Sequence, residues 1–374
     1  MKIGINGGGI GGLAAAIALR KAGHEVEVYE QARDYARVGA DINLTPNAVR
    51  ALKSLGVFEA LKETAARPTH RISRMWDTGE ETSRLEMAEA AEQKYGAPQL
   101  TIHRADLLNA LRRELPENVV LLGHRIEAID NSGPRPTVRF AGGESRTVDV
   151  LIGADGIHSP TRTALFGPEH PQFTGLVSYR AVVDRSKLKV PNLDAFTKWW
   201  GPTPDLQIVT FPLNKGKETF VFATTAQDDW RHESWTMPGD AKELRKAYAD
   251  FHPEARALLD ACESVTKSAL YVREPLPAWS VGRVTLLGDA CHPMTPFMAQ
   301  GACMAIEDAV VLGRALTGAT VDTAPEALKR YENARKERTA RVQIGSRGNE
   351  WLKQGGNADW VYGYAASEVP LEAA

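Results

Sequence analysis

The chain has 374 residues, of which 43% are hydrophobic and 25% are charged, and its formal net charge is −2. This length is enough for two domains that share a large core, and the composition is that of a folded chain rather than a disordered one. Because charges of both signs are interspersed and nearly balanced, no basic face is available for nucleic acid, and that class of partner is excluded.

The cysteines and the first residues of the chain bear on its compartment. Cys262, Cys291 and Cys303 are an odd number without metal-ligand spacing, which favours a reducing compartment and predicts neither a disulfide framework nor a metal site. The glycine-rich start lacks a cleavage-like site and is interrupted by Arg20 and Lys21, so a secretory signal is not expected. No stretch is long and apolar enough to span a bilayer. We therefore expect a cytoplasmic protein without a membrane partner.

The first part of the chain has an α/β pattern. Residues 2–6 predict a buried strand, residues 10–21 a helix and residues 25–29 a second strand, which together form a βαβ unit. A further helix is expected over residues 47–54, with a proline at its start and a glycine just past its end. A polar stretch over residues 70–98 follows.

The pattern then returns to α/β before it changes. A helix is predicted over residues 105–114, and an apolar strand over residues 150–154 ends in Asp155 and Gly156. Strands with a period of two then fill residues 176–222 and predict an antiparallel sheet, with a turn at Asn214-Lys215-Gly216.

The last part of the chain brings the α/β pattern back. Helices are expected near residues 241–250 and 254–262, and an apolar strand starts at Val284. A basic amphipathic helix is expected over residues 325–344. The predicted fold is therefore α/β with an α+β insertion: a Rossmann-like domain that is interrupted by an antiparallel-sheet domain and followed by a C-terminal helix.

A glycine motif lies between the first strand and the first helix. Gly7, Gly9 and Gly12 form G-x-G-x-x-G, which permits a tight turn and a close approach of the backbone to a pyrophosphate. Glu30 ends the second strand at the offset of a ribose-binding carboxylate. The alternative is a glycine turn without a ligand, with Glu30 as a surface charge. The motif, in this context, predicts a dinucleotide site.

Residues 288–302 lie between an apolar strand and a helical pattern over residues 299–316. The turn at Gly288 and Asp289 places a carboxylate at the end of the strand, and free amides at the helix start favour negative charge on a cofactor. Pro296 either stiffens the loop near that cofactor or only marks the helix start.

These motifs resemble the single-component flavin-dependent aromatic hydroxylases of the p-hydroxybenzoate hydroxylase fold. The resemblance rests on residues 7–12, residues 151–162 and residues 288 onward, in the same order. The domains it implies are an FAD-binding domain over residues 1–72, 99–172 and 268–325, a substrate domain over residues 73–98 and 173–267, and a C-terminal helical segment over residues 326–374.

The resemblance also implies a cofactor and a reaction. Arg104 matches an arginine that holds FAD in these enzymes. The expected cofactor-binding residues are Gly7, Gly9, Gly11, Gly12, Glu30, Gln31, Val38, Gly39, Arg104, Asp155, Asp289, Pro296, Gly301 and Ala302. NADH or NADPH is expected to reduce FAD, after which O2 adds at the flavin C4a position and the hydroperoxide hydroxylates a small aromatic substrate. The expected oligomeric state is a monomer or a homodimer.

A base is expected near the substrate, because a phenolate attacks an electrophilic oxygen better than a phenol does. His292 is the first candidate, and Pro296 is the second residue that we place in the catalytic loop. The alternative for His292 is a hydrogen bond to the backbone that only holds the loop.

The chain resembles the 6-hydroxynicotinate monooxygenases over residues 101–104, 198–200 and 360–364, and the salicylate hydroxylases more broadly. It departs from them where substrate is expected, with Asn43 and Phe297 in place of histidines. The expected substrate residues are Asn43, Val209, Phe211 and Phe297. The loss of polar groups predicts a more apolar pocket and leaves decarboxylation open.

Three functions remain open. The first is an FAD-dependent hydroxylase of an aromatic or N-heteroaromatic ring. The second is a flavin-dependent NAD(P)H oxidase or reductase on the same fold. The third is a non-catalytic binding protein on the nucleotide fold, which gives no reason for Arg104, Asp155 and Asp289 to occur together.

Overall fold

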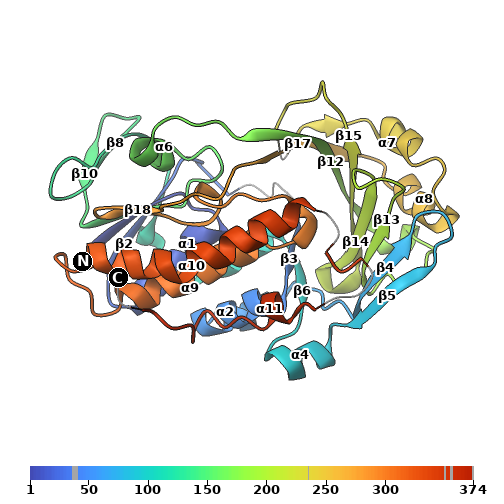
Figure 1. Cartoon of the computed structure of the whole chain (residues 1–374), viewed down its shortest axis with the longest axis horizontal. Helices are drawn as coiled ribbons and strands as arrows, with labels where there is room; N and C mark the ends of the chain where they lie inside the picture. The colour runs from blue at the N-terminus through green and yellow to red at the C-terminus, as the bar shows by residue number, and fades with distance from the viewer. Residues whose placement is uncertain (36–40, 235, 349–350, 354–356, 373–374) are drawn as a thin grey trace.

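The structure is a computed structural model that describes residues 1–35, 41–234, 236–348, 351–353 and 357–372. The six-stranded sheet lies on the left of Figure 1 and the eight-stranded sheet on the right. Helix α10 (Ala324–Arg347) runs across the front from the first sheet toward the second. In the described part of the chain, no helix combines the length and the apolar character that crossing a bilayer demands.

The first sheet consists of short apolar strands in the order β18-β19-β11-β1-β2-β7. They are β1 (Lys2–Asn6), β2 (Glu25–Glu30), β7 (Val120–Leu122), β11 (Val150–Gly153), β18 (Ser280–Val281) and β19 (Val284–Leu286). All neighbours are parallel except β18 and β19. The carboxyl ends of β1, β11 and β19 therefore meet at one edge, where ligands bind in open α/β sheets.

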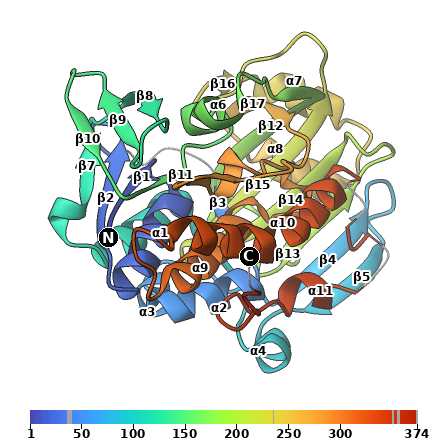
Figure 2. The same cartoon turned by 60° about the vertical axis from the view of Figure 1, so that its left-hand side comes forward.

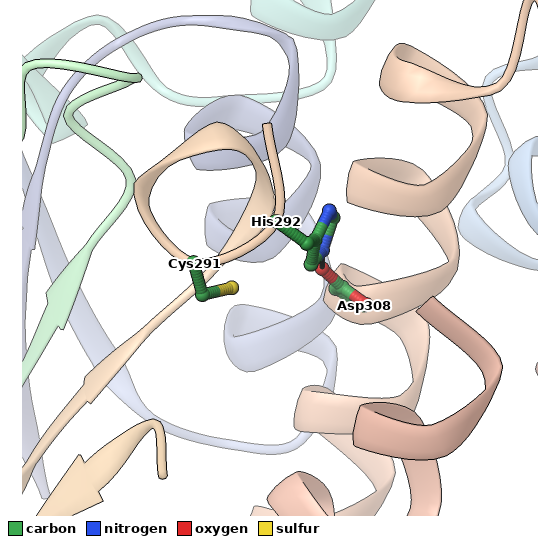
Figure 3. A group of neighbouring side chains, drawn as sticks. All are labelled: Cys291, His292 and Asp308. Atoms are coloured by element: carbon green, nitrogen blue, oxygen red, sulfur yellow. Dashed lines mark hydrogen bonds and ion pairs between the residues drawn. The ribbon is translucent and has the colours of Figure 1, made fainter. Parts of the chain in front are cut away.

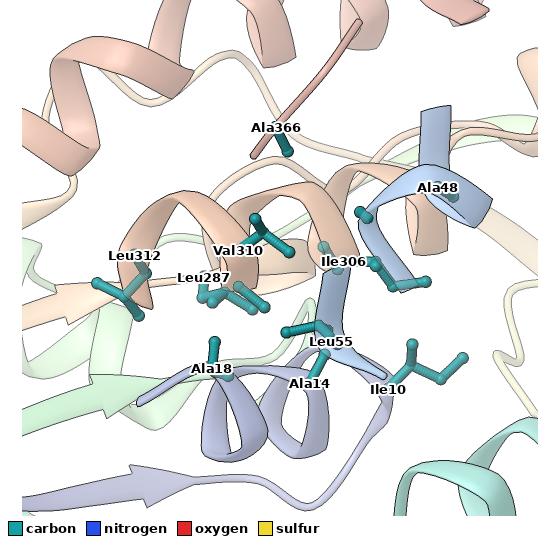
Figure 4. Packing of buried hydrophobic residues seen from close by; sticks show 14 of the residues in the cluster. Ile10, Ala14, Ala18, Ala48, Leu55, Leu287, Ile306, Val310, Leu312 and Ala366 are labelled. Carbon is teal, nitrogen blue, oxygen red and sulfur yellow. The ribbon is translucent and has the colours of Figure 1, made fainter. Parts of the chain in front are cut away.

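Small side chains let the helices beside this sheet pack closely. Helices α1 (Ile10–Lys21) and α9 (Gly301–Leu316) lie against each other, with Ala14 and Ala18 between them (Figure 4). A Cβ atom at Gly313 would lie 2.8 Å from the Cβ atom of Ala18. Helices α2 (Pro46–Leu55) and α5 (Arg104–Arg113) contact α9 and α1 respectively. Helices α3 (Phe58–Leu61), α4 (Glu89–Tyr95) and α11 (Asp359–Tyr362) contact α2, and α6 (Pro160–Phe166) contacts β8 (Ile126–Asp130).

The second sheet has the order β16-β17-β12-β15-β14-β13-β4-β5. Its strands are β4 (His70–Met75), β5 (Glu81–Glu86), β12 (Gln172–Asp184), β13 (Phe196–Trp200), β14 (Gln207–Leu213), β15 (Glu218–Ala226), β16 (Pro238–Gly239) and β17 (Val265–Val272). All neighbours are antiparallel except β4 and β13. Helices α7 (Ala241–Ala247) and α8 (Pro253–Asp260) lie beside it in Figures 1 and 2.

The alternation of side chains divides the second sheet into two faces. Trp199, Ile208 and Val221 belong to a hydrophobic cluster that includes α7 and α8. Their neighbours Lys198 and Val209 line a cavity on the opposite face. One face of the sheet is thus core and the other is available to a ligand.

Two smaller sheets and several short turns complete the fold. A three-stranded sheet contains β8 (Ile126–Asp130), β9 (Thr137–Phe140) and β10 (Ser145–Thr147), and a two-stranded sheet contains β3 (Asp41–Leu44) and β6 (Leu100–His103). Within the described ranges, 3₁₀ turns cover Glu117–Val119, Arg185–Lys187, Asn214–Gly216, Gly288–Ala290 and Pro296–Met298.

The predicted fold class is confirmed by the mixed sheets and helices. One local prediction is wrong: the helix expected from residue 299 begins at Gly301, because Ala299 has φ 55° and follows a 3₁₀ turn. The polar stretch over residues 70–98, for which no element was predicted, contains β4, β5 and α4. Polar side chains on the edge strand β5 hide its pattern.

Candidate active site

A cavity of about 350 Å³ lies between the carboxyl edge of the first sheet and the open face of the second. One end is lined by loops and helix starts: Gly9, Ile10, Gly11, Arg104, Ala154, Gly156, Leu287, Gly288, Asp289, Pro296, Gly301 and Ala302. The other end is lined by side chains of strands and of one loop: Asp41, Asn43, Arg71, Arg180, Phe196, Lys198, Gln207, Val209, Phe211, Phe220, Phe222 and Phe297.

The glycine loop leaves no room for side chains where it packs on the protein, but it leaves space where it borders the cavity. A Cβ atom at Gly12 would lie 1.9 Å from the carbonyl oxygen of Gly7, and one at Gly7 would lie 2.4 Å from that of Ala154. Gly7 also has φ 110°, which disfavours a side chain. At Gly9, which lines the cavity, a Cβ atom would meet no atom within 4 Å. This space beside backbone amides at the start of α1 fits a diphosphate.

Glu30 braces the glycine loop rather than lining the cavity. Its Oε2 atom accepts a hydrogen bond of 2.7 Å from the Gly8 amide, and its Oε1 atom accepts one of 2.7 Å from the Ala32 amide. Gln31 is exposed and is not among the lining residues. Val38 and Gly39, also expected at the cofactor, lie outside the described residues.

Asp155 is held by protein groups. Its Oδ2 atom accepts hydrogen bonds from Asn6 Nδ2 at 2.9 Å and Thr161 Oγ1 at 2.7 Å, and its Oδ1 atom accepts one from Ser159 Oγ at 2.6 Å. Burial raises the pKa of Asp155, and the hydrogen bonds from Ser159 and Thr161 oppose the increase. The adjacent Gly156 lines the cavity, whereas Asp155 joins β1 to α6. The structure thus offers no direct contact for the expected role of the Asp155 side chain at the cofactor.

Asp289 and Arg104 supply opposite charges to the cavity. Asp289 belongs to the turn after β19, where Gly288 has φ 64°, and its side chain is accessible from the cavity. The surrounding protein desolvates the carboxyl group and raises the pKa of Asp289, although His292 and Arg104 oppose this change. Burial lowers the pKa of Arg104, which Asp289 and Glu30 partly counteract. An acceptor for hydroxyl groups and a donor for anionic oxygens therefore share one end of the cavity.

The start of α9 presents backbone amides to the same end. Gly301 and Ala302 line the cavity, and the first turn of α9 contains no acidic side chain. Pro296, which is exposed and opens the preceding 3₁₀ turn, also lines the cavity. The positive end of the helix is therefore free to stabilise an anion.

The structure does not place His292 at the cavity. Its ring is 1% exposed, and Nε2 lies 2.5 Å from Oδ2 of Asp308, toward which it points in Figure 3. Arg335 Nε donates to the other oxygen of Asp308 at 2.7 Å. Cys291, drawn beside them, donates to the carbonyl oxygen of Gly288. His292 thus holds the loop against α9, and its expected role as a base has no contact to support it.

The four residues expected at the substrate all line the second end of the cavity, namely Asn43, Val209, Phe211 and Phe297. Phe211 and Phe196 have stacked rings with centroids 5.6 Å apart, and Phe220 packs against Phe211 at 4.8 Å. The Oδ1 atom of Asn43 accepts a hydrogen bond of 2.6 Å from Gln99. These walls suit a flat apolar ring.

The charged residues at this end were not expected from the sequence. Lys198 is 2% exposed, and its Nζ atom lies 3.8 Å from the Trp200 ring centroid. Burial, together with the charges of Arg71 and Lys353, lowers the pKa of Lys198 well below its ordinary value. Burial also lowers the pKa of Arg180, to about 10. The sequence offered one hint, since Lys198 precedes Trp199 and neighbours on a strand face opposite sides.

Comparison with known proteins agrees with this arrangement. The sequence pattern of the family described as FAD binding domain matches residues 1–345. The chain is 38% identical over 373 residues to a 6-hydroxynicotinate 3-monooxygenase of Pseudomonas fluorescens, which covers 99% of this chain and 96% of that protein. It is 37% identical over 348 residues to a 3-hydroxybenzoate 6-hydroxylase of Polaromonas naphthalenivorans, and the matched region covers 92% of this chain and 86% of that protein.

A solved structure described as a salicylate hydroxylase substrate complex has a TM-score of 0.84 and 27% identity, with coverage of 98% of this chain and 96% of that one. The chain therefore belongs to the FAD binding domain family, with the fold of FAD-dependent hydroxylases. It is an FAD-dependent monooxygenase of aromatic or heteroaromatic rings that uses O2 and a reduced nicotinamide.

Proposed function

We propose that the chain hydroxylates a small aromatic or N-heteroaromatic acid that already carries a hydroxyl group. The proposal is carried by one observation: the end of the cavity with phenyl walls is also lined by the buried side chains of Lys198 and Arg71 and by the half-buried Arg180. An aromatic ring would lie against the phenyl side chains while its carboxylate faces the cations.

The residues at the first end fit FAD. Gly9 and Gly11 would hold the diphosphate, Asp289 and Arg104 would bind its hydroxyl and anionic groups, and the amides of Gly301 and Ala302 would face the flavin ring. When bound, FAD supplies the electron transfer from NADH or NADPH and the activation of O2. The protein positions the aromatic ring and excludes water from the reaction.

Electrostatics favours an anionic substrate. The charge of Lys198 is disfavoured by burial and by two like charges, Arg71 and Lys353. A carboxylate placed beside Lys198 would offset both effects, because an opposite charge stabilises the ammonium form. The names 6-hydroxynicotinate, 3-hydroxybenzoate and salicylate given to the relatives' substrates all denote hydroxylated aromatic acids.

A substrate panel tests this proposal. We expect 3-hydroxybenzoate, salicylate or 6-hydroxynicotinate to stimulate oxidation of NADH or NADPH, with label from ¹⁸O2 entering the ring. The matched amide of an active acid should have a kcat/KM lower by about tenfold or more, because it lacks the charge that pairs with the cations. Product masses would show whether hydroxylation removes the carboxylate.

A variant separates the carboxylate subsite from the rest of the cavity. Lys198→Met should abolish the preference for acid over amide while FAD content stays unchanged, since Lys198 lies at the aromatic end. Stimulated NAD(P)H oxidation without incorporated label would instead favour an oxidase. Light scattering would decide between a monomer and a homodimer, the two oligomeric states that the sequence left open.

A further inference from the structure

We propose that Asp41, His103 and Glu218 form a proton path from the aromatic end of the cavity to solvent, with Asp41 accepting the proton of the substrate hydroxyl. The inference rests on the proposed function and names the group that ionises the substrate.

The three side chains form a continuous chain of contacts. Asp41 lines the cavity and is the cross-strand partner of His103 in the ladder between β3 and β6. Oδ1 of Asp41 lies 2.8 Å from Nδ1 of His103, and Nε2 of His103 lies 3.0 Å from Oε2 of Glu218. The exposed fractions of the three side chains are 1%, 12% and 32%, so the contacts lead outward from the interior.

The second oxygen of Asp41 is available for a proton. Both carboxylate oxygens of Asp41 are buried and meet no hydrogen-bond partner among the described residues, and Oδ1 lies at ion-pair distance, 2.8 Å, from Nδ1 of His103, which leaves Oδ2 without a contact of either kind. Burial raises the pKa of Asp41, which His103 and Arg180 oppose and Glu218 reinforces. A carboxyl group with a raised pKa is a better acceptor for the proton of a phenol.

Few other side chains at the aromatic end of the cavity could accept the proton of the substrate hydroxyl. Among the cavity-lining residues that are described, the carboxylates are Asp41 and Asp289, and Asp289 lies at the cofactor end. Asn43 cannot titrate at neutral pH, and His292 is held by Asp308 outside the lining. Lys198 is the competing base, because its lowered pKa favours the neutral amine.

The transfer balances in protons and charge. Nε2 of His103 is hydrogen-bonded to Glu218 and Nδ1 lies 2.8 Å from Oδ1 of Asp41, so a protonated ring places one proton beside each carboxylate. When the substrate O–H bond breaks, its proton bonds to Oδ2 of Asp41, and the Nε2 proton of His103 passes to Glu218 and then to water. Asp41 and His103 change from an anion and a cation to two neutral groups. The negative charge that remains on the substrate oxygen matches the proton released, and the reverse transfers restore the path after turnover.

The test measures ionisation of the bound ligand apart from turnover. We would record difference absorption spectra of 3-hydroxybenzoate and 6-hydroxynicotinate bound to the FAD-loaded enzyme without oxygen. The wild type should bind the hydroxyl group ionised at a pH below its pKa in water. Asp41→Asn should bind it protonated, and its kcat/KM should rise about tenfold per pH unit until the hydroxyl ionises in solution.

Two positioning variants and a matched control complete the experiment. His103→Gln and Glu218→Gln should slow the reaction with a larger solvent deuterium isotope effect, and added formate should partly rescue Glu218→Gln. Asp184→Asn, at the exposed cross-strand partner of Glu218, should retain the wild-type pH profile. FAD content and melting temperature would identify a variant that misfolds.

The outcomes separate the two proposals. If the wild type hydroxylates the acid and Asp41→Asn still binds it ionised with an unchanged pH profile, the proton path is wrong and the proposed function stands. If ionisation is lost in Lys198→Met but not in Asp41→Asn, Lys198 is the base. If no acid in the panel is bound or hydroxylated by the wild type, the proposed function itself fails.

Discussion

At the residue scale, the glycines of the loop over residues 7–12 are required for different steric reasons. Gly12 is required by the fold, because a Cβ atom there would overlap the carbonyl oxygen of Gly7 at 1.9 Å. Gly9 has open space on the cavity side, so a side chain at Gly9 would compete only with a ligand. The two positions therefore separate folding from cofactor binding.

This difference predicts opposite results for the same substitution. Gly12→Ala should lower the free energy of unfolding of the FAD-free protein by about 1–3 kcal/mol, because the methyl group overpacks the turn. Gly9→Ala should leave that free energy nearly unchanged and weaken FAD binding by about tenfold or more, as expected for lost close contact with the diphosphate. Urea unfolding and fluorescence titration with FAD measure the two effects. Equal destabilisation by both substitutions would contradict the assignment.

At the element scale, buried ion pairs join α10 to α9. Arg335 is fully buried and lies 2.7 Å from both Glu307 and Asp308, and Arg338 adds a further contact to Glu307 at 2.8 Å. Burial disfavours the charged form of both carboxylates. At Glu307, the charges of Arg338 and Arg335 outweigh burial and lower the pKa. At Asp308, His292 and Arg335 have the same effect. The network also fixes the loop that carries Asp289, through His292.

Breaking this network should cost far more than breaking a surface pair. Arg335→Met leaves two buried carboxylates without their shared cation, so we expect the free energy of unfolding to fall by about 3–5 kcal/mol. Lys62→Met, which breaks the exposed pair with Glu59, is the control and should change it by less than about 1 kcal/mol. Urea unfolding at pH 7 measures both. Comparable losses would show that the buried pairs contribute little.

The same network predicts an acid-sensitive component of stability. The pKa of Asp308 is lower in the folded chain than the value of about 3.9 in an unfolded one. Its stabilisation is therefore complete above the unfolded-state pKa and is lost as the pH falls through the folded-state pKa. Asp308→Asn should lower stability at pH 7 and flatten its dependence on pH in the acid range, as measured by urea unfolding at several pH values.

At the scale of the whole molecule, the FAD end of the cavity joins distant parts of the chain. Gly9, Arg104, Asp289 and Gly301 come from four separate segments, and α10 packs on α9 and extends toward the second sheet. A ligand that contacts all four segments would stabilise the first sheet and its helices together, whereas α7 and α8 pack in a separate hydrophobic cluster.

Removal of FAD should therefore loosen one region more than another. At a free FAD concentration of 100 times the Kd, binding adds about 2.7 kcal/mol to the free energy of unfolding, so the FAD-free protein should melt at a lower temperature. Amide hydrogen exchange should accelerate around residues 7–12 and 288–302 and change little in α7 and α8. Uniform acceleration over the whole chain would contradict this localisation.

Local motifs made the fold class and a dinucleotide site predictable, and their resemblance to a known family identified the dinucleotide as FAD. The residues of G-x-G-x-x-G and of the turn at Asp289 act through backbone geometry that depends on near neighbours in the chain, so their spacing alone was informative. Asp155 shows the limit of that approach. The motif marked a loop whose Gly156 lines the cavity, but only the contacts with Asn6, Ser159 and Thr161 revealed which groups hold the carboxylate of Asp155.

The aromatic end of the cavity could be predicted only in part. Asn43, Val209, Phe211 and Phe297 were predicted to contact substrate and they line the cavity, whereas Lys198 and Asp41 line it without having been predicted there. A charged residue in a strand is usually exposed, and no periodic pattern in the sequence marks one that is buried. His292 was chosen for its side-chain chemistry, without knowledge of Asp308 across the loop.

The sequence by itself determined the α/β fold class and a dinucleotide site, because phosphate loops and turns are local structures with local signatures. The flavin-dependent hydroxylase class followed from the resemblance of these motifs to a known family. Only the tertiary structure decided which charges face the substrate. Lys198, Arg71 and Asp41 come from three strands in two different sheets, and their meeting depends on strand order and register. Burial then alters the pKa values of Lys198 and Asp41, and burial is a property of the folded chain rather than of any segment of it.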